Sequence, residues 1–172
     1  MHTITRLSAD TFRDSVKGLA DLLAGTVADG GSVGFLAPFD QGAAAAWWRG
    51  RQAAVDDGSL TMWAAHGPGG LTGTVGLARG AMPAGRRRAE IVKLMVHPDA
   101  RGQGLGRALL ATAEEAAVRA GLTLLHLDTE AGTPAERLYL TAGWTRYGIV
   151  PGYANNPAGV PKDCSFFFKR LG

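Results

Sequence analysis

The chain has almost none of the features that cross-link a protein or hold it in a membrane. It contains one cysteine, Cys164, so no disulfide can form within the chain. No apolar run approaches the ~20 residues of a membrane-spanning helix. The first residues lack the basic segment, apolar stretch and cleavage site of a secretory signal. We therefore expect a cytoplasmic protein without a membrane partner, in which Cys164 is a packed strand residue.

The chain also has no large excess of charge of one sign and no spacing of residues that is typical of a metal site. The net charge is +3 and the isoelectric point about 9.4, which is too mildly basic to indicate a nucleic-acid partner. The densest basic cluster, Arg86–Arg88, is expected to be a solvated turn. The four histidines lack a zinc-like spacing. His126, Asp128 and Glu130 could share a strand face only if that strand continued so far, and we expect no metal.

What the sequence does contain is a strand that runs through glycines into a helix. Residues 90–96 read as a strand buried on both faces, and Pro98 cannot prolong it. Glycines then alternate at 102, 104 and 106, and apolar residues follow at helical spacing from Leu105. The start of a helix has about four backbone N–H groups without intrahelical partners and the positive end of the helix dipole. A pyrophosphate would fit there, with Arg101 and Arg107 as charged donors.

Other interpretations of these glycines fit less well. No Walker string Gly-x-x-x-x-Gly-Lys-[Ser/Thr] occurs, and the spacing is not the Gly-x-Gly-x-x-Gly of a dinucleotide site. A loop that binds no ligand remains an alternative. If the loop does bind a pyrophosphate, bulk at Gly104 should block the ligand and leave the fold little changed.

The rest of the chain alternates strands and helices, which favours a mixed α/β sheet within one domain, residues 1–172. The helix of residues 41–57 carries adjacent Trp47 and Trp48, one of which could border a pocket. A long loop is expected at 151–162. Strands are predicted at 4–7, 60–65, 71–79, 90–96, 122–128, 144–149 and 164–171, and helices at about 9–29, 41–57, 105–120 and 134–142.

Two ordered motifs resemble the GNAT superfamily of acetyl-coenzyme A-dependent N-acetyltransferases. The first, Arg101-Gly-Gln-Gly-Leu-Gly106, resembles the family's pyrophosphate loop, and the second, Ala135 to Trp144, resembles its later helix-to-strand signature. Segments 31–36, 88–96, 124–132 and 151–153 look like the tabtoxin resistance acetyltransferases. The resemblance implies a largely antiparallel central sheet flanked by helices, with strands splayed apart at the acetyl-CoA site.

The resemblance also implies a set of coenzyme-binding residues. Pantetheine would bond to the edge of the strand that ends at Val96, whose amide would polarise the thioester carbonyl. Many members carry an asparagine that bonds pantetheine where this chain has Gly132. The full set of expected coenzyme contacts is Leu94, Met95, Val96, Arg101, Gly102, Gln103, Gly104, Leu105, Gly106 and Arg107.

Two residues are the expected catalysts. Tyr139 matches the family tyrosine that protonates the departing sulfur, although an aromatic at a helix face can also be packing. Asp128 corresponds to the proposed general base, with Glu90 and Glu130 as competitors and turn capping as the alternative.

The implied activity is acetyl transfer to a small-molecule amine, such as a β-lactam amino-acid toxin or an antibiotic, in detoxification or resistance. The alternatives are another small amine, a protein lysine, or a coenzyme A-binding domain without activity. The chain would act as a monomer or a homodimer.

Overall fold

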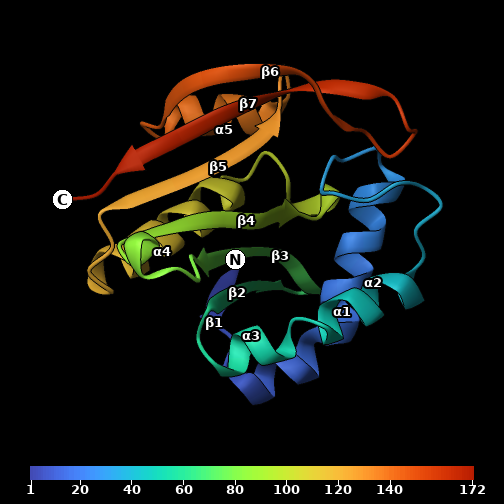
Figure 1. Cartoon of the computed structure of the whole chain (residues 1–172). Helices are drawn as coiled ribbons and strands as arrows, with labels where there is room; N and C mark the ends of the chain where they lie inside the picture. Colours follow the sequence, from blue (N-terminus) through green and yellow to red (C-terminus); the bar gives the residue numbers. More distant parts are fainter.

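The computed structural model describes all of residues 1–172 and contains a seven-stranded sheet in the order β1-β2-β3-β4-β5-β7-β6 (Figure 1). Every neighbouring pair is antiparallel except β4 and β5. This confirms the predicted largely antiparallel sheet flanked by helices. The strands are β1 Thr3–Arg6, β2 Leu60–Gly67, β3 Gly70–Arg79, β4 Arg88–Val96, β5 Leu124–Glu130, β6 Thr145–Asn155 and β7 Pro161–Arg170, and the helices are α1 Ala9–Ala28, α2 Gln41–Arg49, α3 Gln52–Asp56, α4 Leu105–Arg119 and α5 Pro134–Thr141, with short 3₁₀ turns at Pro83–Gly85 and Pro98–Ala100.

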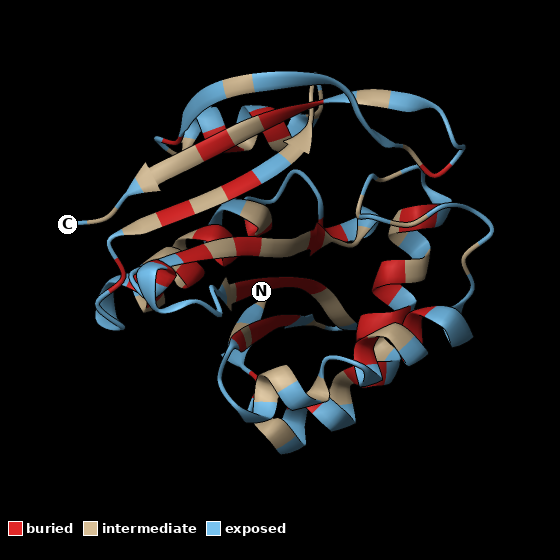
Figure 2. Cartoon of the chain, in the orientation of Figure 1, coloured by how far each residue is buried: buried red, intermediate tan, exposed pale blue.

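The two faces of the sheet carry separate apolar clusters (Figure 2). On one face α1 and α2 bury Phe12, Leu19 and Trp48 completely against β2. On the other face α4 packs Leu109 against strand residues such as Leu125. Each fully buried side chain of this size contributes about 1.5–3 kcal/mol relative to exposure, so both layers hold the sheet in place.

The predicted helix of residues 41–57 is wrong in one respect, because it is two helices. Asp40 caps the start of α2 by accepting a hydrogen bond from the amide of Ala43 at 2.8 Å. Gly50, a poor helix former, ends it. The chain then turns so that α3 can pack on α1, where the Gln52 side chain donates to the carbonyl of Ala9 at 3.1 Å.

The predicted long loop at residues 151–162 is also wrong, because β6 and β7 continue through it as a hairpin. The hairpin turns at Asn156, whose amide donates to the carbonyl of Val160 at 2.9 Å. β6 is an edge strand and almost wholly exposed, so no apolar alternation marks it in the sequence. Its pairing is irregular between Val150 and Ala154, where Pro151 is tolerated.

The predicted strand at 122–128 lies two residues later, at Leu124–Glu130. Leu122 still belongs to the helix exit, where its amide donates to the carbonyl of Ala117 at 3.0 Å. The longer C-terminal end places His126, Asp128 and Glu130 at alternate positions of one strand, on the same face of the sheet.

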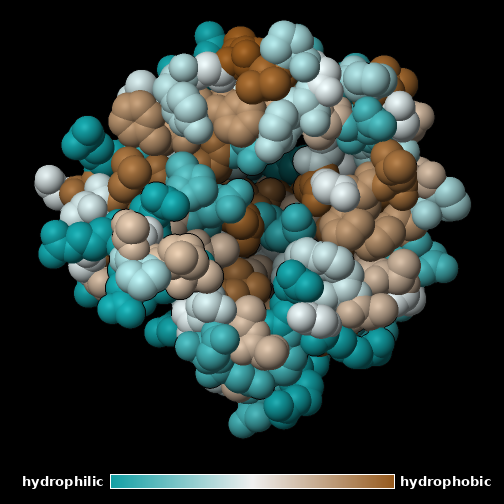
Figure 3. All heavy atoms as spheres, in the orientation of Figure 1, coloured by the Kyte–Doolittle hydropathy of each residue, from teal (hydrophilic) through white to brown (hydrophobic).

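The parallel strands β4 and β5 pair at only one end. Their register runs from Arg88 opposite Leu124 to Glu90 opposite His126 and then stops. Beyond that point β4 continues with β3, and β5 continues with β7 (Figure 1). The surface is hollowed in the same place, near the centre of the view in Figure 3. The splayed strands expected from the sequence are therefore present.

A bulge in β4 lies beside this gap. The pairing of β3 with β4 passes from Thr74 opposite Met95 to Gly76 opposite Val92, which leaves an extra residue on β4. Lys93 in the bulge has a φ of +50°, the one non-glycine residue of the chain with positive φ. Such backbone costs of the order of 1–3 kcal/mol and occurs where the surrounding structure enforces it.

Candidate active site

The end of β4 carries the residues expected to hold pantetheine. Leu94, Met95 and Val96 lie beyond the last pair with β5, so that side of the strand has no strand partner. Backbone groups alternate in direction along a strand, and some of them therefore face the gap. This edge is the only part of β4 to which an extended ligand could bond as an added strand.

The glycine loop leads from this edge into α4, as predicted. Gly102 and Gly104 have φ of +73° and +78°, and no atom lies within 4 Å of a Cβ built at either position. Gly104 is the N-cap of α4 and supplies no side chain to cap it. The first N–H groups of α4 at Leu105, Gly106 and Arg107 therefore remain without a capping side chain, which suits an anion.

The expectation that bulk at Gly104 would leave the fold unchanged needs correction. The space around Gly104 is open, but its left-handed backbone disfavours any side chain. A substitution there affects both the free protein and the ligand site. Gly106 differs, because its φ is not positive and an added Cβ would meet Leu138 at an ordinary 3.5 Å.

The polar side chains of the loop all have partners within the chain. Arg101 donates from Nε to the carbonyl of Val96 at 3.1 Å and lies 3.6 Å from Asp29. Gln103 donates to the carbonyl of Asp99 at 3.0 Å. Arg107 donates to the hydroxyl of Thr141, the last residue of α5, at 2.6 Å. Both arginines are exposed, so each can also reach a phosphate oxygen.

Tyr139 lies on α5 with its ring packed edge-on against Trp144 and tilted against Phe167. Tyr139 is only 6% exposed, and its hydroxyl makes no hydrogen bond within the chain. Every fully buried side-chain oxygen of the protein, however, has a hydrogen-bond partner. The Tyr139 hydroxyl oxygen therefore keeps some contact with solvent. Burial raises the pKa of the phenol, and the negative charge of Asp128 raises it further, so Tyr139 is protonated at neutral pH.

Asp128 faces the cleft together with Glu90. Partial burial raises the pKa of the Asp128 carboxyl, and the charges of His126 and Lys93 oppose that shift. Burial also raises the pKa of Glu90, while His126 lowers it and Asp128 raises it. Both groups keep access to solvent, and a carboxylate with a raised pKa is a stronger base than an ordinary one.

Glu130 is held by its neighbours. Its carboxylate accepts a hydrogen bond from the hydroxyl of Ser32, in the loop before α2. It therefore positions that loop against the end of β5, which makes it a weaker candidate for the base than Asp128.

The loop that contains Gly132 is fixed by a carboxylate that the sequence did not single out. The amide of Gly132 donates to Glu136 at 2.7 Å, and Ser165 and Arg146 donate to the other oxygen of the same carboxylate. The Ser165 hydrogen bond, then that of Gly132, lowers the pKa of Glu136, with Arg146 adding to the effect. Gly132 thus contributes its backbone amide to the hydrogen bonds that fix this loop.

Sequence reasoning missed Lys93 and Phe35 as site residues, and it left open whether Trp47 or Trp48 borders a pocket. The Lys93 ammonium donates to the carbonyl of Val33 at 3.0 Å and lies 5.0 Å from the Trp47 ring centroid and 5.6 Å from that of Phe35. Burial lowers the pKa of Lys93, although Glu90 and Asp128 raise it. A charged residue in an otherwise apolar strand pattern was the one available signal. Trp48 is fully buried and donates to the carbonyl of Leu19 at 3.1 Å, and with Trp47 it also borders a pocket.

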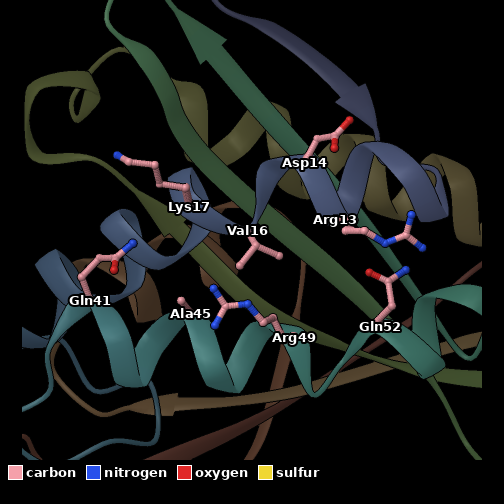
Figure 4. A pocket seen from close by; sticks show the side chains of 8 residues that line it. All are labelled: Arg13, Asp14, Val16, Lys17, Gln41, Ala45, Arg49 and Gln52. Carbon is pink, nitrogen blue, oxygen red and sulfur yellow. The ribbon is translucent and has the colours of Figure 1, made fainter.

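A surface hollow of about 730 Å³ lies elsewhere. It is an open groove between α1 and α2 with Val16 and Ala45 at its apolar base and charged side chains around it, including Arg13, Lys17 and Arg49 (Figure 4). None of the expected site residues lines it. Size alone therefore does not locate the chemistry here.

Comparison with known proteins identifies the class. The acetyltransferase (GNAT) family model matches residues 32–144, and the chain belongs to this family. It is accordingly an acetyl-CoA-dependent N-acetyltransferase. The matched region includes β4, the glycine loop, β5 and α5, and therefore both motifs.

Solved structures share the fold at low sequence identity. A Salmonella typhimurium protein assigned as an acetyltransferase, solved with its cofactor acetyl-CoA, has a TM-score of 0.77 and 21% identity over 100% of this chain and 95% of its own. A ribosomal-protein-alanine N-acetyltransferase from Brucella melitensis has a TM-score of 0.78 and 22% identity, covering 98% and 99%. A protein assigned as a phosphinothricin N-acetyltransferase has a TM-score of 0.80 and 18% identity, covering 100% and 99%.

No helix is both long and apolar enough to span a membrane. His126, Asp128 and Glu130 share a strand face, but no three His, Cys, Asp or Glu side chains gather in an arrangement that could hold a metal ion. Cys164 is buried in β7, as predicted.

Proposed function

We propose that the protein transfers an acetyl group from acetyl-CoA to the amine of a small molecule, in the gap between β4 and β5. The observation that carries this proposal is the end of the β4–β5 pairing at Glu90 and His126, which leaves a bare strand edge next to the glycine loop. Strand edge and loop together form what we call the coenzyme half of the cleft, residues 94–96 and 101–107. The seven-stranded sheet draws on both ends of the chain, which supports a single domain of residues 1–172.

In this proposal Asp128 is the base. An aliphatic amine arrives at neutral pH mainly as an ammonium ion, and only the neutral amine attacks a carbonyl carbon. The Asp128 carboxylate accepts the ammonium proton, directly or through a water molecule. Its position on β5, across the gap from β4, supports this role.

Tyr139 is the acid in the same proposal. The amide of Val96 polarises the thioester carbonyl, the amine nitrogen bonds to the carbonyl carbon, and the carbon–sulfur bond breaks. The Tyr139 hydroxyl gives its proton to the departing sulfur, and the nitrogen loses a proton as the amide forms, which restores the Tyr139 hydroxyl. The negative charge of Asp128 is one cause of the raised pKa of Tyr139, after burial. Protonation of Asp128 therefore lowers the pKa of Tyr139, so the base step makes the acid stronger.

We further propose that the acceptor is a small amine such as a β-lactam amino-acid toxin or antibiotic. Segments that resemble the tabtoxin resistance acetyltransferases support this choice, and they include Leu124–Gly132 around Asp128.

The test is thiol release from acetyl-CoA with a panel of amines, followed by mass spectrometry of the products. Turnover should appear with at least one small amine, and its product should gain one acetyl group. A protein that acetyl-CoA stabilises against heat without any turnover would instead be a coenzyme-binding domain. Acetylation of protein lysines alone would overturn the small-molecule acceptor.

A further inference from the structure

A second pocket, of about 260 Å³, lies between α2, α3 and the strands β2 to β4. Its apolar lining includes Trp47, Leu60 and Met62. Its charged lining is of one sign only, because Arg51, Arg79 and Lys93 border it and no carboxylate does. None of these three cations forms a salt bridge elsewhere in the chain. The pocket is thus a basic site with an apolar wall.

The pocket adjoins the proposed catalytic carboxylates. Ala78, which borders the pocket, stands opposite Glu90 in the β3–β4 register, and Glu90 stands opposite His126 of β5. Residues opposite one another on adjacent strands share a face of the sheet, so the pocket and the carboxylates open on the same side. Asp128 follows His126 on that face.

Lys93 stands where the two regions meet. It lines the basic pocket and interacts electrostatically with both Glu90 and Asp128 on one side and with Arg51 on the other. Trp47 holds the two cations, with Lys93 Nζ 5.0 Å and Arg51 Cζ 5.2 Å from its ring centroid. The left-handed backbone of Lys93 is a strained conformation that the bulge maintains. Strain of this kind is characteristic of functional positions.

The cleft therefore has an acidic end at Asp128 and Glu90 and a basic end at Lys93 and Arg51. A molecule with an ammonium group and an anionic group would satisfy both ends, whereas a simple amine would leave the basic end without a partner. The volume of about 260 Å³ lies below the usual range of pockets that hold drug-sized ligands, which suits an acceptor of amino-acid size.

We infer that the acceptor is a carboxylate-bearing amine of amino-acid size, whose carboxylate is bound by Lys93 and Arg51 beside Trp47 while its amine lies at Asp128. This inference rests on the proposed function, because it assigns the acceptor to the same cleft. It makes Lys93 and Arg51 the residues that determine acceptor specificity. The bulge in β4 then serves to position Lys93 for binding the carboxylate.

The experiment uses matched acceptors that differ only in the carboxylate, phenylalanine and leucine against phenethylamine and isoamylamine. Binding to the protein saturated with coenzyme A is measured by calorimetry, which does not depend on turnover. Acetylation by acetyl-CoA is measured separately. The variants are Lys93→Met and Arg51→Met, with Arg49→Met as the control, since Arg49 lies on α2 but lines the other groove.

We expect the wild-type protein to bind and acetylate the carboxylate member of a pair at least tenfold better. Lys93→Met should weaken carboxylate binding by about 10- to 100-fold through the loss of a charge-assisted hydrogen bond, and Arg51→Met by a smaller factor. Arg49→Met should match the wild type. The simple amines should change less than threefold in every variant.

Equal losses for both members of a pair, or a wild-type preference for the simple amines, would overturn the inference. The inference would also be overturned if neither phenylalanine nor leucine bound to the wild-type protein. Carboxylate-selective binding that depends on Lys93 without any acetylation would uphold the inference about the pocket while contradicting the proposed function.

Discussion

The coenzyme half of the cleft is nearly one continuous piece of chain, whereas the acceptor half is assembled from segments that lie far apart in the sequence. Residues 94–107 supply the strand edge, the glycine loop and the start of α4. The acceptor half brings together Trp47 of α2, Lys93 of β4 and Asp128 of β5, with Phe35 from the loop before α2.

The difference follows from what each half recognises. A coenzyme is held largely by backbone groups, so the chain must provide an unpaired strand edge and glycines at positive φ. These requirements are met by residues close together in the sequence and can be recognised there as a motif. An acceptor is selected by side chains, which tertiary packing alone brings together. Breaking one half should therefore leave the other intact.

The largest effect is expected at Tyr139, where the two halves meet. Tyr139→Phe should lower kcat by roughly 10²–10⁴ and change substrate binding little, because the lost proton donor acts on charge that develops at sulfur. Steady-state kinetics under conditions where chemistry limits the rate would measure this. The control is Tyr147→Phe, on an exposed tyrosine of β6, and wild-type turnover in Tyr139→Phe would exclude Tyr139 as the acid.

Asp128→Asn should lower kcat/KM by roughly 10²-fold at neutral pH. In the wild type, activity should fall as pH falls through the pKa of Asp128, which partial burial raises from its ordinary value, because the base becomes protonated. The variant should lack this dependence and recover activity at high pH, where the amine is already neutral. Asp14→Asn serves as the control.

A pH profile of kcat/KM separates the roles of Asp128. If the Michaelis constant rises and stays high while the amine is charged, Asp128 docks the amine instead of deprotonating it. Full activity of Asp128→Asn at neutral pH would move the base to Glu90 or Glu130.

The same contrast explains how far sequence reasoning reached. The motif from Arg101 to Gly106 predicted the loop and the helix start, since both rest on local backbone requirements, whereas the gap beside β4 was implied by the family resemblance. Lys93 was not predicted as a site residue, because its position depends on a bulge set by pairing with β3. The second half of the exposed strand β6, residues 151–155, was predicted as a loop, since an edge strand has no buried face to impose an apolar pattern.

Within the coenzyme half, Gly104→Ala should lower the stability of the free protein by about 1–2 kcal/mol, the cost of a side chain in left-handed backbone. It should also weaken acetyl-CoA binding. The matched control Gly106→Ala should leave stability equal or slightly higher, because alanine favours helix and the added Cβ meets no tight contact. Thermal melts of both variants, with and without acetyl-CoA, would show whether the two glycines differ in this way.

The smallest expected effect on activity lies at Glu136, which supports the Gly132 loop. Glu136→Gln should lower stability by about 1.5–3 kcal/mol, because a charged acceptor for Gly132, Ser165 and Arg146 is lost. The folded-state pKa of Glu136 is lowered, so its contribution is present above the unfolded pKa of about 4.3 and is lost as pH falls through the folded pKa.

Denaturant unfolding at several pH values would check this dependence. The difference in unfolding free energy between the wild type and Glu136→Gln should become smaller as the solution is acidified. Glu115→Gln, on a side chain that is 71% exposed, should show almost no change at any pH. If this difference in unfolding free energy stayed constant down to acidic pH, the assigned role of the carboxylate would be contradicted.

The independence of the two halves is tested most directly by the dissociation constant of acetyl-CoA in two variants, measured by calorimetry without any acceptor. The account predicts that Asp128→Asn binds acetyl-CoA within about twofold of the wild type, and that Gly104→Val binds it at least about tenfold more weakly, since one charge-assisted phosphate contact is worth that much. A loss of acetyl-CoA affinity in Asp128→Asn as large as that in Gly104→Val would contradict the division of the cleft.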